Sequence, residues 1–169
     1  MSTATDTGVE RIAAAFAGAA GRAALMPYLM GGFPDVETSV RIGEAYADNG
    51  ADLVELGVPF SDPLADGPVI HAAGTRALEA GSTLHRVLEV GARLAHRLPV
   101  VLMCYANPIL ARGLERFTHD LVDAGVSGLI VPDLPLEESG AVLEACDAAG
   151  LALVPLAAPT SSPCAASAA

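Results

Sequence analysis

Short apolar runs alternate with longer amphipathic segments along most of the chain. Each apolar run ends in Gly, Pro or a polar residue, and nearly continuous hydrophobicity is typical of strands buried on both faces of a parallel sheet. The pattern predicts five such strands, within residues 24–32, 52–59, 100–106, 128–135 and 151–159. The remaining segments repeat apolar positions with the period of a helix, which predicts helices over residues 8–20, 35–49, 84–97, 110–124 and 137–149 and a short additional helix over 69–79.

Three glycines mark places where a predicted helix ends and a strand begins. Gly50, Gly125 and Gly150 each follow a helical segment and stand directly before an apolar run. Glycine adopts the left-handed conformation that stops a helix without a steric penalty. The regular alternation of helix and strand predicts an α/β fold built around a parallel sheet.

The carboxyl ends of the predicted strands favour a barrel over an open sheet. No G-x-G-x-x-G motif follows the first strand, so a dinucleotide-binding open sheet lacks its best marker. In a (β/α)8 barrel the chemistry lies at the carboxyl ends of the strands. Polar side chains stand there in this chain: Glu55, Tyr105, Asn107 and Asp133. Because a closed barrel has eight strands and about 250 residues, we expect an incomplete barrel of about five strand–helix units plus an N-terminal helix.

The composition limits the classes of partner. At 169 residues, 52% of them apolar and 17% charged, the chain is long enough for one domain with a substantial core. Its formal net charge of −11 argues against nucleic acids and anionic membranes as partners. The three cysteines lack C-x-x-C spacing, which indicates reduced thiols, and neither a signal peptide nor a membrane-spanning run is present. These features predict a cytoplasmic protein.

The absence of lysine removes several catalytic mechanisms. All nine basic residues are arginine, so neither a lysine Schiff base nor a P-loop lysine is available. The four histidines fall in predicted helices or beside them rather than at strand ends, and we therefore predict no metal site: His71, His85, His96 and His119.

Five motifs carry a resemblance to a known family. They are "PYLMGGFPD", "GADLVELGVPFSDPLADGP", "MCYANP", "GLIVPDLPLEE" and "APTSS", and they lie between about residues 24 and 162. In order and spacing they are similar to the tryptophan synthase alpha subunit, and "ELGVPFSDPLADGP" is highly specific to that family. The resemblance implies a (β/α)8 TIM barrel and a lyase that cleaves indole-3-glycerol phosphate to indole and glyceraldehyde 3-phosphate in tryptophan biosynthesis.

The resemblance also implies a partner. Alpha subunits of this family dock on a beta subunit in an alpha2-beta2 heterotetramer, and the beta subunit receives indole through a tunnel. Pyridoxal phosphate belongs to the beta subunit, so the resemblance implies no cofactor for this chain. The loop that would contact the partner carries Pro59, Phe60 and Asp62.

Two carboxylates suit a retro-aldol cleavage in which the substrate supplies its own electron sink. Protonation of indole C3 turns the ring into a cation, which accepts the electrons of the breaking C–C bond. Glu55 lies in an apolar strand, where desolvation raises a carboxyl pKa and favours a proton donor. Asp66 lies in a polar loop, where a carboxylate could accept the indole N–H and stabilise the cation. In the family these two matching positions are the catalytic pair.

Structural explanations exist for the same residues. A glutamate within a strand commonly pairs with an arginine or lies at a sheet edge, and aspartates among Pro and Gly, such as Asp62 and Asp66, commonly cap turns. By resemblance the substrate pocket would also be lined by Tyr28, Met103, Tyr105 and Pro132, although a tyrosine inside a barrel can simply belong to the core. Asp133 would support the site indirectly, by holding residues that line it.

The resemblance to the family ends near residue 162, because no strand or helix pattern of the family follows it. We therefore expect a partial barrel domain over residues 1–162 and a small-residue tail over 163–169, without strands six to eight and the Gly-rich phosphate site. Truncation, a frameshift or a partial gene model would each account for this. The functions left open are an alpha-type lyase with impaired activity and a non-catalytic fragment that associates with a beta subunit or with itself. A phosphate-binding barrel of the isomerase or epimerase type fits least, because it has no use for the Glu–Asp loop.

Overall fold

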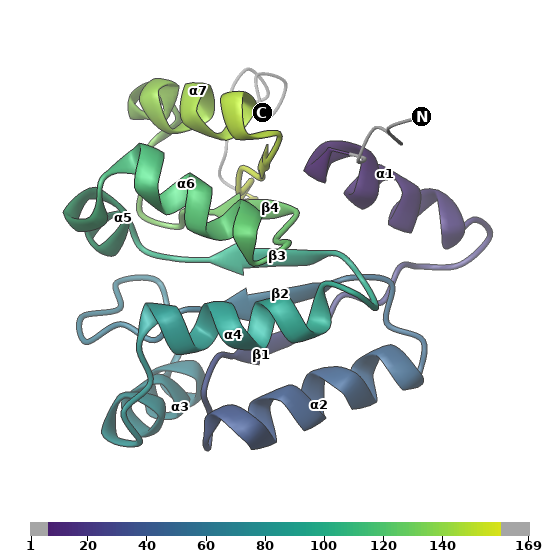
Figure 1. Ribbon diagram of the computed structural model, residues 1–169, viewed down its shortest axis with the longest axis horizontal. Coiled ribbons are helices and arrows are strands. Elements are labelled where there is room, and N and C mark those ends of the chain that lie inside the picture. The colour runs from purple at the N-terminus through teal and green to yellow at the C-terminus, as the bar shows by residue number, and fades with distance from the viewer. Residues whose placement is uncertain (1–6, 160–169) are drawn as a thin grey trace.

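A five-stranded parallel sheet forms the centre of the molecule. The structure is a computed structural model that describes residues 7–159, and Figure 1 shows its helices packed around the sheet. The strands are β1 (Tyr28–Met30), β2 (Val54–Gly57), β3 (Val100–Met103), β4 (Gly128–Ile130) and β5 (Ala152–Leu153). They lie side by side in the order β1-β2-β3-β4-β5, and every neighbouring pair is parallel. Strands that are neighbours in sequence and also in the sheet are the arrangement of a β/α barrel, whereas a doubly wound sheet reverses its strand order. The predicted α/β class and parallel sheet are confirmed.

Helices follow each of the first four strands. They are α2 (Val36–Asp48), α3 (Pro68–Glu79), α4 (Leu84–Leu94), α5 (Ala106–Arg112), α6 (Leu114–Asp123), the 3-10 turn η1 (Leu136–Glu138) and α7 (Gly140–Ala149), whereas α1 (Gly8–Gly18) precedes β1. Side-chain oxygens cap the first turns of three helices: Thr7 accepts the Glu10 amide at α1, Asp35 accepts the Thr38 amide at α2, and Thr83 accepts the Arg86 amide at α4. None of the described helices is long and apolar enough to cross a membrane.

The single helix predicted over residues 110–124 is wrong. The structure has two helices here, α5 and α6, which meet at Gly113. The backbone of Gly113 has a φ of 85°, a left-handed value that breaks the hydrogen-bonded ladder and redirects the chain. The apolar periodicity continues across this joint, so the hydrophobic pattern alone did not reveal it.

Alternate residues of the strands face two different environments. One set packs beneath α2, α4, α6 and α7 in the main core, where Val54, Leu56, Leu102 and Leu129 are fully buried. The other set faces the side on which α1 packs, which we call the inner face. There Leu53, Val101 and Ile130 form a smaller cluster against Ile12 and Ala15 of α1.

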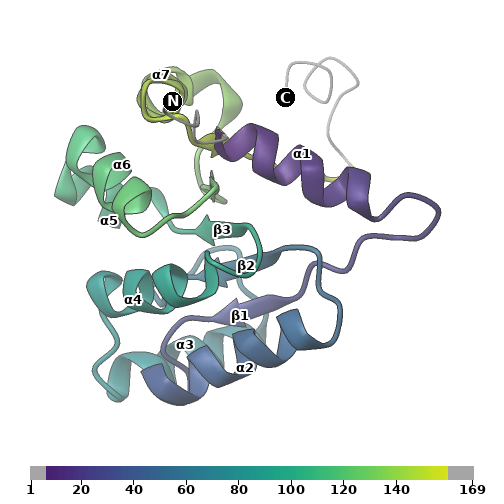
Figure 2. The same ribbon diagram turned by 45° about the vertical axis from the view of Figure 1, so that its right-hand side comes forward.

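Close backbone contact fixes α1 at the amino ends of β4 and β5. The Gly8 amide donates to the Gly150 carbonyl at 2.7 Å, and a Cβ atom at Gly8 would lie 1.8 Å from the Ser127 carbonyl oxygen. The Arg11 guanidinium donates to the carbonyls of Ala95 and Gly125, each at 2.9 Å. Figure 2 shows the amino-terminal end of α1 beside the end of α7, near the upper strands. The helix therefore covers the end of the sheet opposite to the carboxyl ends of the strands.

Candidate active site

Glu55 stands on the inner face of the sheet, between two neighbouring strands. In the register of the sheet it lies opposite Tyr28 on β1 and opposite Val101 on β3. Its side chain is half-buried, and this burial raises the pKa of its carboxyl group above the ordinary value. Within residues 7–159, Glu55 forms no ion pair with an arginine, and β2 is a central strand, so neither structural explanation for a glutamate in a strand applies.

Tyr28 packs against the backbone of β2 beside this carboxyl group. A Cβ atom added to Gly57 would lie only 2.0 Å from the Tyr28 hydroxyl, so the tyrosine fills the space that glycine leaves. Burial raises the pKa of Tyr28, and the negative charges of Asp66 and Glu55 raise it further. Both carboxylates therefore lie close enough to act on the same phenol group. Sequence reasoning missed Gly57, although a glycine at the end of an apolar strand signals close approach by another group.

Tyr105 holds the loop that carries Asp66. The backbone amide of Ala65 donates a hydrogen bond of 2.9 Å to the Tyr105 hydroxyl, and the Phe60 ring stacks on the Tyr105 ring with centroids 5.2 Å apart. Burial raises the pKa of Tyr105, the Ala65 hydrogen bond opposes this rise, and the negative charge of Asp66 adds to it. Asp66 is partly buried, and its charge acts on both Tyr28 and Tyr105 at the strand ends, which a residue that only caps a turn need not do.

The other predicted pocket residues lie around this centre. Met103 is half-buried one layer above Glu55, where it pairs in register with Gly57 and Ile130. Pro132 follows β4 and lines a small cavity of about 120 Å³ with residues of the chain after β5. The Asp133 carboxylate accepts the Ala106 amide at 2.9 Å and so holds the first residue of α5. The predicted pocket residues are brought to one end of the sheet, while the cavity at Pro132 opens toward β5.

The predicted partner-facing residues divide into two groups. Asp62 is exposed, whereas Pro59 is buried and Phe60 is partly buried against Tyr105. Leu64, two residues after Asp62, is 85% exposed and was not singled out from the sequence. A leucine between Pro63 and Ala65 in an otherwise polar loop was the signal available.

Metal-binding and thiol chemistry find no support at this end of the sheet. Across residues 7–159, no group of three or more His, Cys, Asp and Glu side chains is placed to hold a metal ion. Each of the four histidines is exposed on or beside the outer helices. Cys104 and Cys146 are free thiols, and burial raises their pKa values to about 12 and about 11, so neither is a reactive thiolate at neutral pH.

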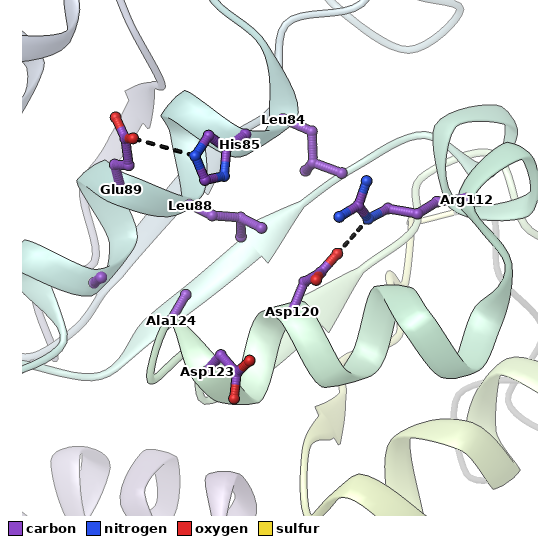
Figure 3. Close-up of a pocket in the computed structure, with 9 residues that line it drawn as sticks. Leu84, His85, Leu88, Glu89, Arg112, Asp120, Asp123 and Ala124 are labelled. Carbon is purple, nitrogen blue, oxygen red and sulfur yellow. Dashed lines mark hydrogen bonds and ion pairs between the residues drawn. The ribbon is translucent and has the colours of Figure 1, made fainter.

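A separate cavity of about 270 Å³ lies on the outer helical layer. Figure 3 shows that it opens between α4 and α6, with His85 facing Glu89 on one side and Arg112 facing Asp120 on the other. None of the predicted site residues lines it. We therefore place the candidate active site at the carboxyl ends of β1–β4 and not in this cavity.

Known proteins share both the sequence and the fold of this chain. The family model of the tryptophan synthase alpha chain matches residues 15–165. Tryptophan synthase alpha chains of Prochlorococcus marinus and Synechococcus elongatus are 53% and 54% identical to it over 144 residues, which cover 84% of this chain and 52% and 54% of those relatives. The chain thus spans about half the length of the curated relatives it matches.

Solved structures give the same result. A ligand-free tryptophan synthase structure from M. tuberculosis superimposes with a TM-score of 0.88 at 38% identity, over 92% of this chain and 64% of that chain. A structure of the tryptophan synthase α2β2 complex from Pyrococcus furiosus gives a TM-score of 0.79 at 36% identity, over 82% of this chain and 60% of that chain. The five-stranded sheet and its helices are therefore part of a TIM barrel, and the chain belongs to the tryptophan synthase alpha chain family.

Proposed function

We propose that this chain carries the acid–base residues of a lyase that cleaves indole-3-glycerol phosphate to indole and glyceraldehyde 3-phosphate. One observation carries the proposal: a half-buried glutamate with a raised pKa lies on the inner face, and a second carboxylate acts on the same tyrosine. Membership of the alpha chain family supports the choice of substrate. The absence of lysine from the chain supports a mechanism in which the indole ring, rather than an enzyme imine, accepts the electrons.

Glu55 acts as the general acid in this proposal. Its proton goes to C3 of the indole ring, which becomes a cation conjugated through the ring nitrogen. The bond between C3 and the glycerol carbon then breaks, and its electron pair restores the aromatic ring. The glycerol hydroxyl becomes the aldehyde and loses its proton to the ionised Glu55, which regenerates the acid. A carboxyl group with a raised pKa suits both transfers near neutral pH.

Asp66 stabilises the cation in this proposal. Its carboxylate accepts the indole N–H, which carries part of the positive charge after protonation at C3. Such a fixed anion accelerates the reaction only if it is already oriented when charge develops. The hydrogen bond from Ala65 to Tyr105 restrains the residue next to Asp66 and supports this orientation. Tyr28, Met103 and Pro132 supply apolar surface that fits an indole ring.

A beta subunit is the proposed partner. The support is the exposed segment at Asp62 and Leu64 beside the site, together with the α2β2 assembly of the Pyrococcus furiosus relative. Pyridoxal phosphate would belong to that partner, and the proposed chemistry needs no cofactor in this chain. A cytoplasmic location stays a prediction, with the unpaired thiols of Cys104 and Cys146 in its favour.

The exposed loop also favours a second candidate function, association with a beta subunit without turnover. To separate the two, the chain is mixed with a purified beta subunit, and complex formation and release of indole from indole-3-glycerol phosphate are measured together. Indole release that disappears in Glu55→Gln supports the lyase. A stable complex that releases no more indole than the beta subunit alone supports the second function and contradicts the first.

A further inference from the structure

Hydrogen bonds connect the segments that follow three neighbouring strands. After β4, the Asp133 carboxylate accepts the amide of Ala106, the first residue of α5. After β3, Tyr105 immediately precedes α5, and its hydroxyl accepts the amide of Ala65 in the segment after β2. Asp66 is the next residue. A continuous path thus leads from Asp133 through Tyr105 to the residue that we propose as the stabilising anion.

Tyr105 is able to transmit the position of one segment to the next because it is itself constrained. It is the residue before the first turn of α5, with an extended backbone, and its own side chain does not cap the helix. Only 4% of its surface is exposed, and the Phe60 ring stacks on it. A shift of its backbone would therefore move the hydroxyl group that holds Ala65, since the ring has little room to compensate.

We propose that Asp133 is a positioning residue that sets the place of Asp66 by fixing Tyr105 at the start of α5. The hydrogen bond of Asp133 goes to the backbone amide beside Tyr105 and not to the loop that carries Asp66. The consequence for catalysis rests on the function proposed above, whereas the mechanical coupling from Asp133 to Ala65 does not. The two claims are therefore tested by different measurements.

The competing explanation is that Asp133 only stabilises α5. That helix has a second anchor at its other end, where the Arg112 guanidinium pairs with the Asp120 carboxylate of α6. Asp120→Ala removes this anchor without touching Tyr105 or Ala106. It is thus a matched control, because both variants remove a carboxylate that holds α5 and only Asp133 lies on the path to Ala65.

The test is hydrogen exchange of the Ala65 amide, followed by NMR in the full chain. Asp133→Ala is expected to accelerate this exchange about two- to tenfold, the effect of losing one hydrogen bond. Tyr105→Phe should do the same, because it removes the acceptor itself. Asp133→Asn keeps an oxygen acceptor and should retain most of the protection, and Asp120→Ala should leave the Ala65 amide unchanged.

Equal acceleration at Ala65 in Asp133→Ala and Asp120→Ala would overturn the proposal, as would an unchanged Ala65 amide in a folded Asp133→Ala protein. If Asp133→Ala does not fold, the unmodified chain provides the test. The amides of Ala65 and Ala106 should then show the same dependence of exchange on denaturant, because they open together, and different dependences would refute the coupling.

Catalysis is measured separately in the complex with a beta subunit. A positioning role predicts that Asp133→Ala lowers kcat with little change in KM, and that Asp133→Asn restores most of it. Accelerated Ala65 exchange without an effect on kcat would keep the coupling and contradict the role of Asp66. Unchanged Ala65 exchange together with a lowered kcat in Asp133→Ala would contradict the coupling and leave the role of Asp66 standing.

Discussion

Tyr28 and Glu55 are register partners on adjacent parallel strands, and their side chains share the inner face of the sheet. The charge of Glu55 contributes to the raised pKa of Tyr28, after the larger effects of burial and of Asp66. A carboxyl group beside a phenol that stays protonated has a neutral neighbour and no counter-ion. Burial raises the pKa of Glu55, and Tyr28 supplies no positive charge that would lower it, so the carboxyl group keeps the property that a proton donor requires.

Replacing Glu55 by glutamine should remove most turnover of indole-3-glycerol phosphate. In the complex with a beta subunit, we expect Glu55→Gln to lower kcat by about 10²–10⁴-fold, the usual contribution of general acid–base catalysis. Circular dichroism should remain unchanged, because the amide is almost the same size. Glu89→Gln, on the exposed surface of α4, is the control and should retain activity. Undiminished turnover in folded Glu55→Gln would contradict the assignment.

The pH dependence of stability provides a test that needs no substrate. Because burial raises the pKa of Glu55, the folded state keeps this proton to a higher pH than the unfolded state, where the pKa is about 4.3. Ionisation of Glu55 therefore reduces stability as the pH rises from the unfolded pKa through the folded one. Urea unfolding should show Glu55→Gln as stable as the unmodified chain near pH 3.5 and more stable at pH 7. An equal loss of stability at both pH values would show that the carboxyl group is not desolvated.

Asp66 should be needed as an anion. We expect Asp66→Asn to lower kcat by about 10²–10³-fold, as the loss of one oriented electrostatic group does, because a neutral amide cannot offset the charge on the indole ring. The measurement is steady-state release of indole, with Asp147→Asn on the exposed face of α7 as a control for the loss of one charge. Near-normal turnover in Asp66→Asn would leave that residue as a turn former.

Association with a beta subunit should depend on the exposed part of the loop after β2. Asp62→Lys, Leu64→Asp and deletion of residues 61–65 are each expected to weaken the complex at least tenfold, because Asp62 and Leu64 project into solvent beside the site. Affinity is measured by titration with purified beta subunit. Asp123→Lys makes the same charge change on α6, and its affinity should match that of the unmodified chain. A complex that tolerates all three loop changes would place the partner elsewhere.

The packing of α1 should depend on Gly8 and not on Gly18. A Cβ atom at position 8 would meet the Ser127 carbonyl oxygen at 1.8 Å, whereas a Cβ atom at position 18 has nothing within 4 Å. We expect Gly8→Ala to reduce the free energy of unfolding by about 1–3 kcal/mol and Gly18→Ala to change it by less than about 0.5 kcal/mol. Urea titration measures both. Equal stabilities would mean that α1 is not held at the amino ends of the strands.

Much of the architecture could be predicted from the sequence because it depends on local patterns. Apolar runs identified all five strands, and Gly50, Gly125 and Gly150, each with positive φ, stand at the joints where they were expected. The place of Glu55 within an apolar strand already predicted a desolvated carboxyl group. These features follow from the chemistry of residues that are neighbours in the sequence, so the sequence alone is enough to predict them.

Tertiary structure decided what depends on contacts between distant segments. The left-handed turn at Gly113 divides a continuous helical pattern in two, since a glycine tolerates either conformation and the surrounding packing selects one. The bond from Ala65 to Tyr105 and the bond from Ala106 to Asp133 join residues 40 and 27 positions apart. Residues 62 and 66 are both aspartates in one loop rich in small residues and proline, and their local sequence does not show which of them lies near the strand ends. Only the folded loop partly buries Asp66 close enough to Tyr28 and Tyr105 for its charge to act on them and leaves Asp62 in solvent, because a side chain's surroundings are set by the segments that pack against it.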